Sequence, residues 1–427
     1  MDTLVLLGSF FLLMIVGVPV AYSLGLAALA GALWMELPLD AVMIQIASGV
    51  NKFSLLAIPF FVLAGAIMAE GGMSRRLVAF AAVFVGFIRG GLSLVNILAS
   101  TFFGAISGSS VADTASIGSV LIPEMERKGY PRDFATAVTV SGSVQAILIP
   151  PSHNAVIYSL AAGGGVSIGA LFMAGVMPGL LLGLTLAILC LFIAKKRNFP
   201  KGEVIPLKQA VRISIDALWG LATIIIILGG ILSGVFTATE SASIAVVWAF
   251  FVTMFIYRDY KWRDLPRLVH RTVKTVSIVM ILIGFAAAFG YLMTLMQIPL
   301  KVTAFFSTLS DNRYVILMMI NVLLLALGTL MDMAPLILIL TPILLPMVVK
   351  LGVDPVHFGM IMMVNLGIGL LTPPVGAVLF VGAAVAKLKI EAVVKALYPF
   401  FGAMLLVLML VTYVPAISLW LPNLMFK

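Results

Sequence analysis

The residues best suited to chemistry lie in one short stretch of the first half of the chain. Residues 107–110 read SGSS and interrupt an apolar run, and Asp113 follows within a few residues. Carboxylate and hydroxyl oxygens are the ligands that hard cations prefer. An ionisable side chain inside a membrane segment is a functional-site hypothesis by default. The stretch therefore suggests a site for a cation such as sodium.

A second polar interruption follows in the same half. Pro150-Pro151 breaks the next apolar run, and Ser152, His153 and Asn154 come directly after it. Irregular backbone at membrane depth survives only where it is buried in protein or lines a wet cavity. Such breaks free carbonyl groups, which suit a cation, and N–H groups at helix starts, which suit a carboxylate substrate. The pattern favours a binding site over a simple membrane span.

The same layout recurs in the second half, over residues 327–380. Three landmarks share an offset of 223 positions: Pro123 with Pro346, Gly129 with Gly352, and Pro150-Pro151 with Pro373-Pro374. Asp332 is interpreted as the counterpart of Asp113, although their offset of 219 requires a short insertion or deletion. Paired broken segments in two halves point to a transporter's binding site. Two ordinary spans with proline kinks are the alternative, and the shared offset argues against them.

We predict about two sodium sites, one in each half, and no organic cofactor. The candidate sodium ligands are Ser107, Ser109, Ser110, Asp113, Gly142 and Ser143 in the first half, and Gly328, Thr329, Asp332, Gly367 and Thr372 in the second. The candidate substrate-binding residues are Ser109, Ser152, His153, Asn154, Asp332 and Asn365. No catalytic residue is assigned. Helix N-capping is an alternative role for both Asp113 and Asp332.

The composition sets the protein class. Hydrophobic residues make up 62% of the chain, charged residues 10%, and the mean hydropathy is +1.20. This predicts an all-α polytopic protein of the lipid bilayer, placed in a bacterial inner membrane. The net charge of +9 does not indicate nucleic acid, because the basic residues sit in short loops between apolar runs. The single cysteine, Cys190, excludes a disulfide within the chain.

The apolar runs divide the chain into repeating pieces. Runs of about a dozen residues are short for a span, so residues 92–106 with 111–125, and 314–327 with 334–349, are predicted as re-entrant hairpins. Residues 134–160 and 357–386 are predicted as broken spans. The basic segment 258–274 is predicted as an interfacial helix, and Glu240 as a helix cap.

Six segments follow from this division. They are 1–91 (scaffold and arm of the first repeat), 92–163 (first transport-domain hairpin and broken helix), 164–212 (scaffold span and basic cytoplasmic loop), 213–312 (scaffold and arm of the second repeat), 313–386 (second transport-domain hairpin and broken helix) and 387–427 (C-terminal scaffold span). Each half has about five crossings plus a hairpin. An odd number of crossings inverts the second half, so the hairpins enter from opposite sides and their tips meet near the midplane.

Several motifs carry a family resemblance along nearly the whole chain. They are GVPVAYSLGLA, LLAIPFFVLAGAIMAEGGMSRRL, SGSSVADTASIG, ILIPPS, GVFTATESAS, LGTLMDMAP, LTPILLP and GIGLLTPPVGAVLF. With them the chain resembles the large, DctM-like membrane subunit of the tripartite ATP-independent periplasmic (TRAP) transporters. The resemblance implies a sodium-driven elevator that takes up an organic acid anion of the sialic acid or C4-dicarboxylate type.

The resemblance also implies partners. A periplasmic substrate-binding protein would deliver the anion, and a small four-helix membrane subunit, expected as a separate chain, would brace the scaffold. A stand-alone sodium:anion symporter with similar hairpins is the main alternative. An intramembrane hydrolase built from Ser107 or Ser152, His153 and an aspartate is disfavoured, because the second half keeps the architecture without an equivalent Ser/His pair.

Overall fold

The computed structural model describes residues 2–426, which form an all-helical protein. The helices of the first half are α1 (Asp2–Ile15), α2 (Val20–Trp34), α3 (Leu39–Val50), α4 (Ala57–Glu70), α5 (Met73–Val85), α6 (Gly91–Ser107), α7 (Ser110–Arg127), α8 (Arg132–Gly142), α9 (Gln145–Leu148), α10 (His153–Ala161) and α11 (Ile168–Lys196). Those of the second half are α12 (Leu207–Leu232), α13 (Ala238–Phe251), α14 (Leu265–Leu295), α15 (Ile298–Leu309), α16 (Arg313–Gly328), α17 (Met333–Lys350), α18 (Pro355–Gly369), α19 (Ala377–Ala386), α20 (Ile390–Tyr413) and α21 (Ala416–Met425).

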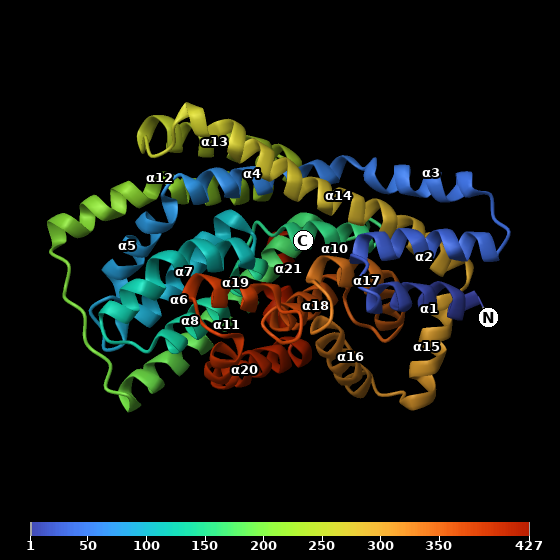
Figure 1. Cartoon of the computed structure of the whole chain (residues 1–427). Coiled ribbons are helices and arrows are strands. Elements are labelled where there is room, and N and C mark those ends of the chain that lie inside the picture. Colours follow the sequence, from blue (N-terminus) through green and yellow to red (C-terminus); the bar gives the residue numbers. More distant parts are fainter. Residues whose placement is uncertain (1, 427) are drawn as a thin grey trace.

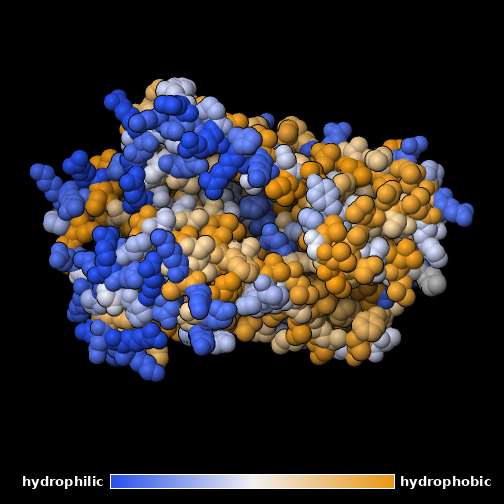
Figure 2. All heavy atoms as spheres, viewed as in Figure 1, coloured by the Kyte–Doolittle hydropathy of each residue, from blue (hydrophilic) through white to orange (hydrophobic). Residues whose placement is uncertain are grey.

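The surface and helix lengths are those of a membrane protein. Seven described helices are long and apolar enough to cross a membrane, or up to eight if the bent pair Arg132–Leu148 and His153–Ala161 counts as one span. Figure 2 shows apolar residues over much of the visible face and hydrophilic residues gathered at its left end. These findings confirm an all-α polytopic membrane protein.

Two groups of helices make up the fold. The first, here called the outer layer, contains α1–α4 and α12–α14, with α4 packed against α13 and α14 packed against α2, α3 and α4. Figure 1 shows α12, α4, α14 and α3 along the upper edge of the molecule. The second group, here called the hairpin bundle, contains α6–α11 and α16–α21. The arms α5 and α15 join the two groups at opposite ends of the view (Figure 1).

The hairpin bundle consists of two similar sets of helices. α6, α7 and α8 begin at residues 91, 110 and 132, and α16, α17 and α18 begin at 313, 333 and 355, which is 222, 223 and 223 positions later. Helices of each half pack against helices of the other half. α7 packs against α19 and α8 against α20, while α17 packs against α10 and α18 against α11. Reciprocal contacts between the two halves therefore hold the bundle together.

Several predicted elements differ in the structure. The basic segment 258–274 is not a separate helix, because from Leu265 it forms the first part of the 31-residue helix α14. Its one proline lies in the first turn, where proline is tolerated. The C-terminal scaffold span predicted within residues 387–427 ends at Tyr413, because Pro415 precedes the separate helix α21. The capping role of Glu240 is confirmed by a capping box with Thr237.

Two helices predicted as scaffold spans pack elsewhere. α11 and α20 lie within segments 164–212 and 387–427, respectively. α11 packs against α6, α9, α18 and α21, and α20 packs against α8, α11 and α18. By contact both helices belong to the hairpin bundle. Hydropathy identifies a span, but it does not reveal which neighbours the span will have.

Candidate functional site

The first hairpin turns at Gly108. α6 ends at Ser107, Gly108 has a positive φ of 60°, and Ser109 caps α7 by accepting a hydrogen bond from the Ala112 N–H at 3.4 Å. Glycine adopts this left-handed conformation at low cost. A side chain at position 108 would also collide with the Pro151 carbonyl oxygen. The SGSS tip therefore lies directly against the break in the second polar stretch.

The same tip also contacts the outer layer. Gly65 of α4 lies so close that a Cβ added to it would be 3.1 Å from the Cα of Ser107. Ser107 and Ser110 are buried, and Ser109 is partly buried. The first tip is thus enclosed between α4 and the broken helix of its own half.

Asp113 lies one turn into α7 and is completely buried. Neither of its carboxylate oxygens has a hydrogen-bond partner, so the N-capping alternative is wrong for this residue. The Ser100 hydroxyl is near enough to influence the carboxylate, but no hydrogen bond of ordinary geometry joins the two groups. A buried charge without a partner is costly. This makes Asp113 the least satisfied group in the described part of the hairpins.

Three further buried hydroxyls on α6, α7 and α8 were not predicted from the sequence. Ser100 on α6, Thr114 on α7 and Ser141 on α8 are fully buried, and none of their oxygens has a partner. The three helices pack against one another. Together with Asp113 they supply five unpaired oxygen atoms. The signal available in the sequence was the position of Ser141 beside the predicted ligand Gly142.

The predicted broken span of the first half, residues 134–160, is irregular from the end of α8 to the start of α10, and not only at the proline pair. α8 ends at Gly142, the short α9 follows, and α10 begins only after the cis peptide bond Pro150-Pro151. The two arms of the break meet at 50°. Ser143 donates a hydrogen bond to the Val140 carbonyl at 2.8 Å, whereas the buried Ser152 hydroxyl has no partner.

The residues after this break differ in exposure. Asn154 is buried and His153 is partly buried. Both lie in the first turn of α10, next to the first tip through the contact of Gly108 with Pro151. The structure therefore brings the predicted residues of the first half together around the tip and the break.

The second hairpin contacts its own broken helix through backbone. Gly328, the last residue of α16, lies so close to Gly369 that an added Cβ would be 3.2 Å from the Gly369 Cα. The Val375 N–H donates to the Thr329 carbonyl at 3.0 Å. Thr372 donates its hydroxyl proton to the Ile368 carbonyl at 2.9 Å. Pro373-Pro374 is cis, as is the first proline pair.

Asp332 is not the structural counterpart of Asp113. It caps α17, with Oδ1 accepting from the Met333 N–H at 2.8 Å, and it is exposed. The residue 223 positions earlier is Ser109, which caps α7. The residue 223 positions after Asp113 is Leu336, which is buried in α17. The N-capping alternative is confirmed for Asp332, and no insertion or deletion is needed to align the two hairpins.

Asn365 belongs to a buried polar network. Its Nδ2 donates to the backbone carbonyl and the side-chain oxygen of Asn321, at 3.0 and 2.9 Å. Asn321 in turn donates to the Thr412 hydroxyl at 2.9 Å. The Asn365 side-chain oxygen is buried without a partner. Among the described side chains of α18, this oxygen and the His357 Nδ1 are buried without a hydrogen-bond partner.

The two breaks lie next to each other. A Cβ added to Gly367 would be 2.8 Å from a methyl carbon of Val144, in the first break. Each tip therefore contacts the break of its own half, and the breaks contact each other. This places the predicted residues of both halves in one connected region of the hairpin bundle.

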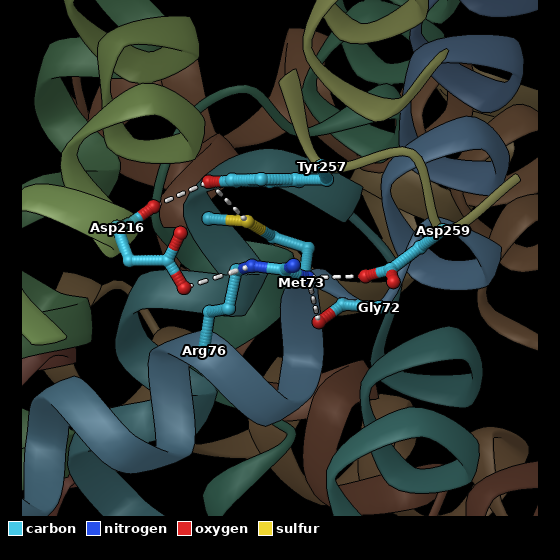
Figure 3. A network of polar contacts seen from close by, with 6 residues as sticks. All are labelled: Gly72, Met73, Arg76, Asp216, Tyr257 and Asp259. Atoms are coloured by element: carbon cyan, nitrogen blue, oxygen red, sulfur yellow. Dashed lines mark hydrogen bonds and ion pairs between the residues drawn. The ribbon is translucent and has the colours of Figure 1, made fainter. Parts of the chain in front are cut away.

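The first arm is fixed to the outer layer at its N-terminal end, as Figure 3 shows. Arg76 of α5 pairs with Asp259 at 2.5 Å and with Asp216 of α12 at 3.1 Å. Its guanidinium carbon lies 3.7 Å from the ring centroid of Tyr257. Burial raises the pKa of Tyr257 to about 12, so the phenol keeps its proton and donates it to the Asp216 carbonyl at 2.6 Å. The second arm contacts α1 of the outer layer through a side-chain hydrogen bond that Lys301 donates to Thr3 at 3.2 Å.

No group of three or more His, Cys, Asp or Glu side chains in residues 2–426 is arranged to hold a metal ion. The first half instead offers one carboxylate with neutral hydroxyls. Such an all-oxygen set fits a hard monovalent cation better than a transition metal, which prefers imidazole or thiolate.

A family model described as "Tripartite ATP-independent periplasmic transporter, DctM component" matches residues 7–417. The chain belongs to this family. A C4-dicarboxylate TRAP transporter large permease of Rhodobacter capsulatus is 39% identical over 100% of both chains. A sialic acid TRAP transporter large permease of Vibrio cholerae is 37% identical over 96% of each chain. The motifs of this TRAP permease chain thus identified the family correctly.

Solved structures support the fold of the TRAP permease chain. The Alcanivorax borkumensis YdaH transporter has a TM-score of 0.63 over 90% of this chain and 88% of its own, with 16% sequence identity. The Neisseria gonorrhoeae MtrF efflux pump has a TM-score of 0.57 over 90% and 84%, with 14% identity. At such identities the likeness concerns the fold alone.

Proposed function

We propose that this chain takes up a small organic acid anion across the bacterial inner membrane, coupled to sodium, as the large subunit of a TRAP transporter. The observation that carries the proposal is Asp113, a fully buried carboxylate with two unpaired oxygens. It lies just behind a hairpin tip that touches a broken helix. Membrane carboxylates in such positions mark ion pathways.

Sodium is written here as a transported ion. In the first half, Asp113 with the hydroxyls of Ser100, Thr114 and Ser141 would hold it, because these buried oxygens lack other partners. The predicted ligands Ser107, Ser109, Ser110, Gly142 and Ser143 would complete the shell from the tip and the break. A bound cation would remove the cost of the unpaired charge.

In the second half the cation ligands would be mostly neutral. Gly328, Thr329, Gly367 and Thr372 supply carbonyl and hydroxyl oxygens near the contact of tip and break. Asp332 caps the start of α17 and its side chain is exposed. Because an exposed carboxylate can still contact sodium or the substrate, we retain Asp332 as a candidate for both.

The anion would bind between the two halves, at the starts of helices. Helix N-termini carry a partial positive charge and free N–H groups, which suit a carboxylate. The starts of α7 and α10 carry Ser109, Ser152, His153 and Asn154. In the second half, Asn365 lies on α18, close to the break. Relatives are named for C4-dicarboxylates and sialic acid, so we propose an anion of one of these types.

The movement would be an elevator with inverted repeats. The reciprocal contacts within the hairpin bundle support a single moving body, including α11 and α20. The outer layer would be the fixed scaffold, and the arms would link the two. The two hairpins would enter from opposite sides of the membrane, as the odd number of crossings predicts.

A periplasmic substrate-binding protein and a small membrane subunit are the proposed partners. The family name describes a tripartite transporter. A relative from Oleidesulfovibrio alaskensis, named an isethionate TRAP transporter permease protein DctMQ, is 43% identical, and the match covers 97% of this chain but 66% of the relative. The extra length of that relative leaves room for a second subunit on the same chain.

Reconstitution tests the proposal. The chain is placed in proteoliposomes with the small subunit, the binding protein is added outside, and uptake of a labelled C4-dicarboxylate and of sialic acid is measured. We expect uptake of one of them that requires an inward sodium gradient and no ATP. Equal uptake with potassium replacing sodium on both sides would contradict the coupling. Full-rate uptake by this chain alone would favour a stand-alone symporter.

A further inference from the structure

A pocket lies at the joint between the first arm and the hairpin bundle. It has a volume of about 590 Å³ and is lined by Ile88, Arg89, Leu191, Lys195 and Asn198. Arg89 donates to the Asn198 side-chain oxygen at 2.8 Å. The Gly90 N–H donates to the Pro200 carbonyl at 3.1 Å. The pocket is therefore bounded by the α5–α6 link on one side and the end of α11 on the other.

The pocket is positively charged, without compensation. Arg89 and Lys195 both line the pocket, and its lining contains no carboxylate. Neither residue forms an ion pair with another residue of the 2–426 range. A second pocket provides the contrast: it contains Arg75 and Arg76, but Asp216 and Asp259 also line it. There Arg76 is already neutralised from two sides (Figure 3). Of these two pockets, the one at Arg89 has no carboxylate in its lining to neutralise its two cations.

An apolar stripe leads to the same pocket. Leu184, Ile188 and Leu191 of α11 are 60%, 58% and 39% exposed, and their spacing places them on one helix face that ends at Lys195. From residue 184 to residue 195 the helix rises by about 16 Å. Half the hydrocarbon core of a bilayer is about 15 Å thick. The stripe therefore matches the length of one lipid leaflet, with the cations at its polar end.

We propose that this pocket binds the phosphate headgroup of an anionic phospholipid, with an acyl chain along the α11 stripe. The basic residues of 195–212, opposed only by Glu203, place this end of the molecule at the cytoplasmic surface. The leaflet there is the one that attracts basic juxtamembrane segments. The headgroup would join Arg89, in the α5–α6 link, to Lys195 at the end of α11. It would thereby steady the joint between arm and bundle.

Lipid titration followed by native mass spectrometry tests the proposal. The full chain in detergent is titrated with phosphatidylglycerol and, separately, with phosphatidylcholine of the same acyl chains. We expect tighter binding of phosphatidylglycerol. The double variant Arg89→Gln with Lys195→Gln should lose this preference, with binding about thirtyfold weaker, because each basic group contributes about a factor of five.

A matched control removes the same charges elsewhere. Lys208→Gln with Arg212→Gln also deletes one lysine and one arginine, but from the part of the 195–212 segment that does not line the pocket, and both residues are exposed. This variant should bind phosphatidylglycerol as the wild type does. Equal losses in both double variants, or equal affinity of the wild type for the two lipids, would overturn the proposal.

Two further experiments distinguish binding of a lipid from binding of a soluble anion. Leu191→Asn should weaken binding of long-chain phosphatidylglycerol while leaving the charges in place. Inorganic phosphate at millimolar concentration should not displace the lipid. Displacement by phosphate, with no effect of Leu191→Asn, would show a site for free anions and overturn the lipid assignment. Melting temperatures of all variants show that each is folded.

Discussion

The two hairpins share their length and layout but differ in where they place a carboxylate. In the first, Ser109 caps the second helix, and Asp113 lies four residues deeper, buried without a partner. In the second, Asp332 itself is the cap, and the deeper position holds Leu336. The repeat therefore conserves the position of the helix cap but not the position of the carboxylate. Two cation sites made from these hairpins would differ in composition, one with a carboxylate inside it and one mostly neutral.

The largest effect is expected from Asp113→Asn. Losing the carboxylate should weaken sodium binding about a hundredfold, which corresponds to about 2.7 kcal/mol. Without sodium the variant should be at least as stable as the wild type, because an unpaired buried charge has been removed. Sodium should raise the melting temperature of the wild type and not of the variant.

Asp332→Asn is the comparison for that change, because it tests the carboxylate of the second hairpin. It makes the same chemical substitution in the other hairpin, and the amide still caps the helix. Sodium dependence of uptake and of melting is measured for both variants. An unchanged half-saturating sodium concentration for Asp113→Asn would mean that this carboxylate does not hold the ion.

Gly108→Ala should have the next largest effect. The positive φ at this position costs an L-residue about 1–2 kcal/mol, and the new methyl group would collide with the Pro151 carbonyl. Gly328→Ala, in the second hairpin, is the comparison, because its backbone is helical and an added Cβ would be 3.2 Å from its nearest neighbour. Denaturation midpoints should fall more for Gly108→Ala. The reverse order would mean that the second tip is the tighter of the two.

Asp332→Ala should lower stability by about 1 kcal/mol through loss of the cap, whereas Asp332→Asn should be nearly silent. Melting temperature and uptake are measured for both variants. If Asp332→Asn keeps the stability but loses uptake, the carboxylate contacts sodium or the substrate, and the two hairpins are more alike in function than in geometry.

Ser141→Ala should have the smallest effect. Its hydroxyl is buried and unpaired, so its removal should leave stability unchanged or slightly higher. Sodium affinity should fall a few-fold if the hydroxyl is a ligand. Ser143→Ala is the comparison, because that hydroxyl has a partner in the Val140 carbonyl, to which it donates. A larger loss of sodium affinity at Ser143 would favour the ligand predicted from the sequence.

The sequence predicted the hairpins and the breaks well, because glycine and proline mark them locally. Gly108 and the two proline pairs lie where the structure turns or breaks. Matching residue types was less reliable than matching offsets: pairing Asp113 with Asp332 ignored the 223-residue spacing, which pairs Asp332 with Ser109.

Other features were beyond local patterns. Ser100 and Thr114 look like ordinary polar residues of apolar helices, and only the packing of α6 against α7 and α8 reveals that they are buried without partners. The packing of α11 and α20 against the other half's helices also depends on long-range contacts, which hydropathy does not encode.

The two arms have a mechanical consequence. α5 has 13 residues and α15 has 12, so they are about 20 and 18 Å long. Arg76 ties α5 to the outer layer at one end, and Gly90, with a φ of 75°, lies at the other. Two struts of nearly equal length thus join the hairpin bundle to the outer layer at opposite ends. In the elevator movement proposed above, such struts would let the bundle slide while keeping its orientation.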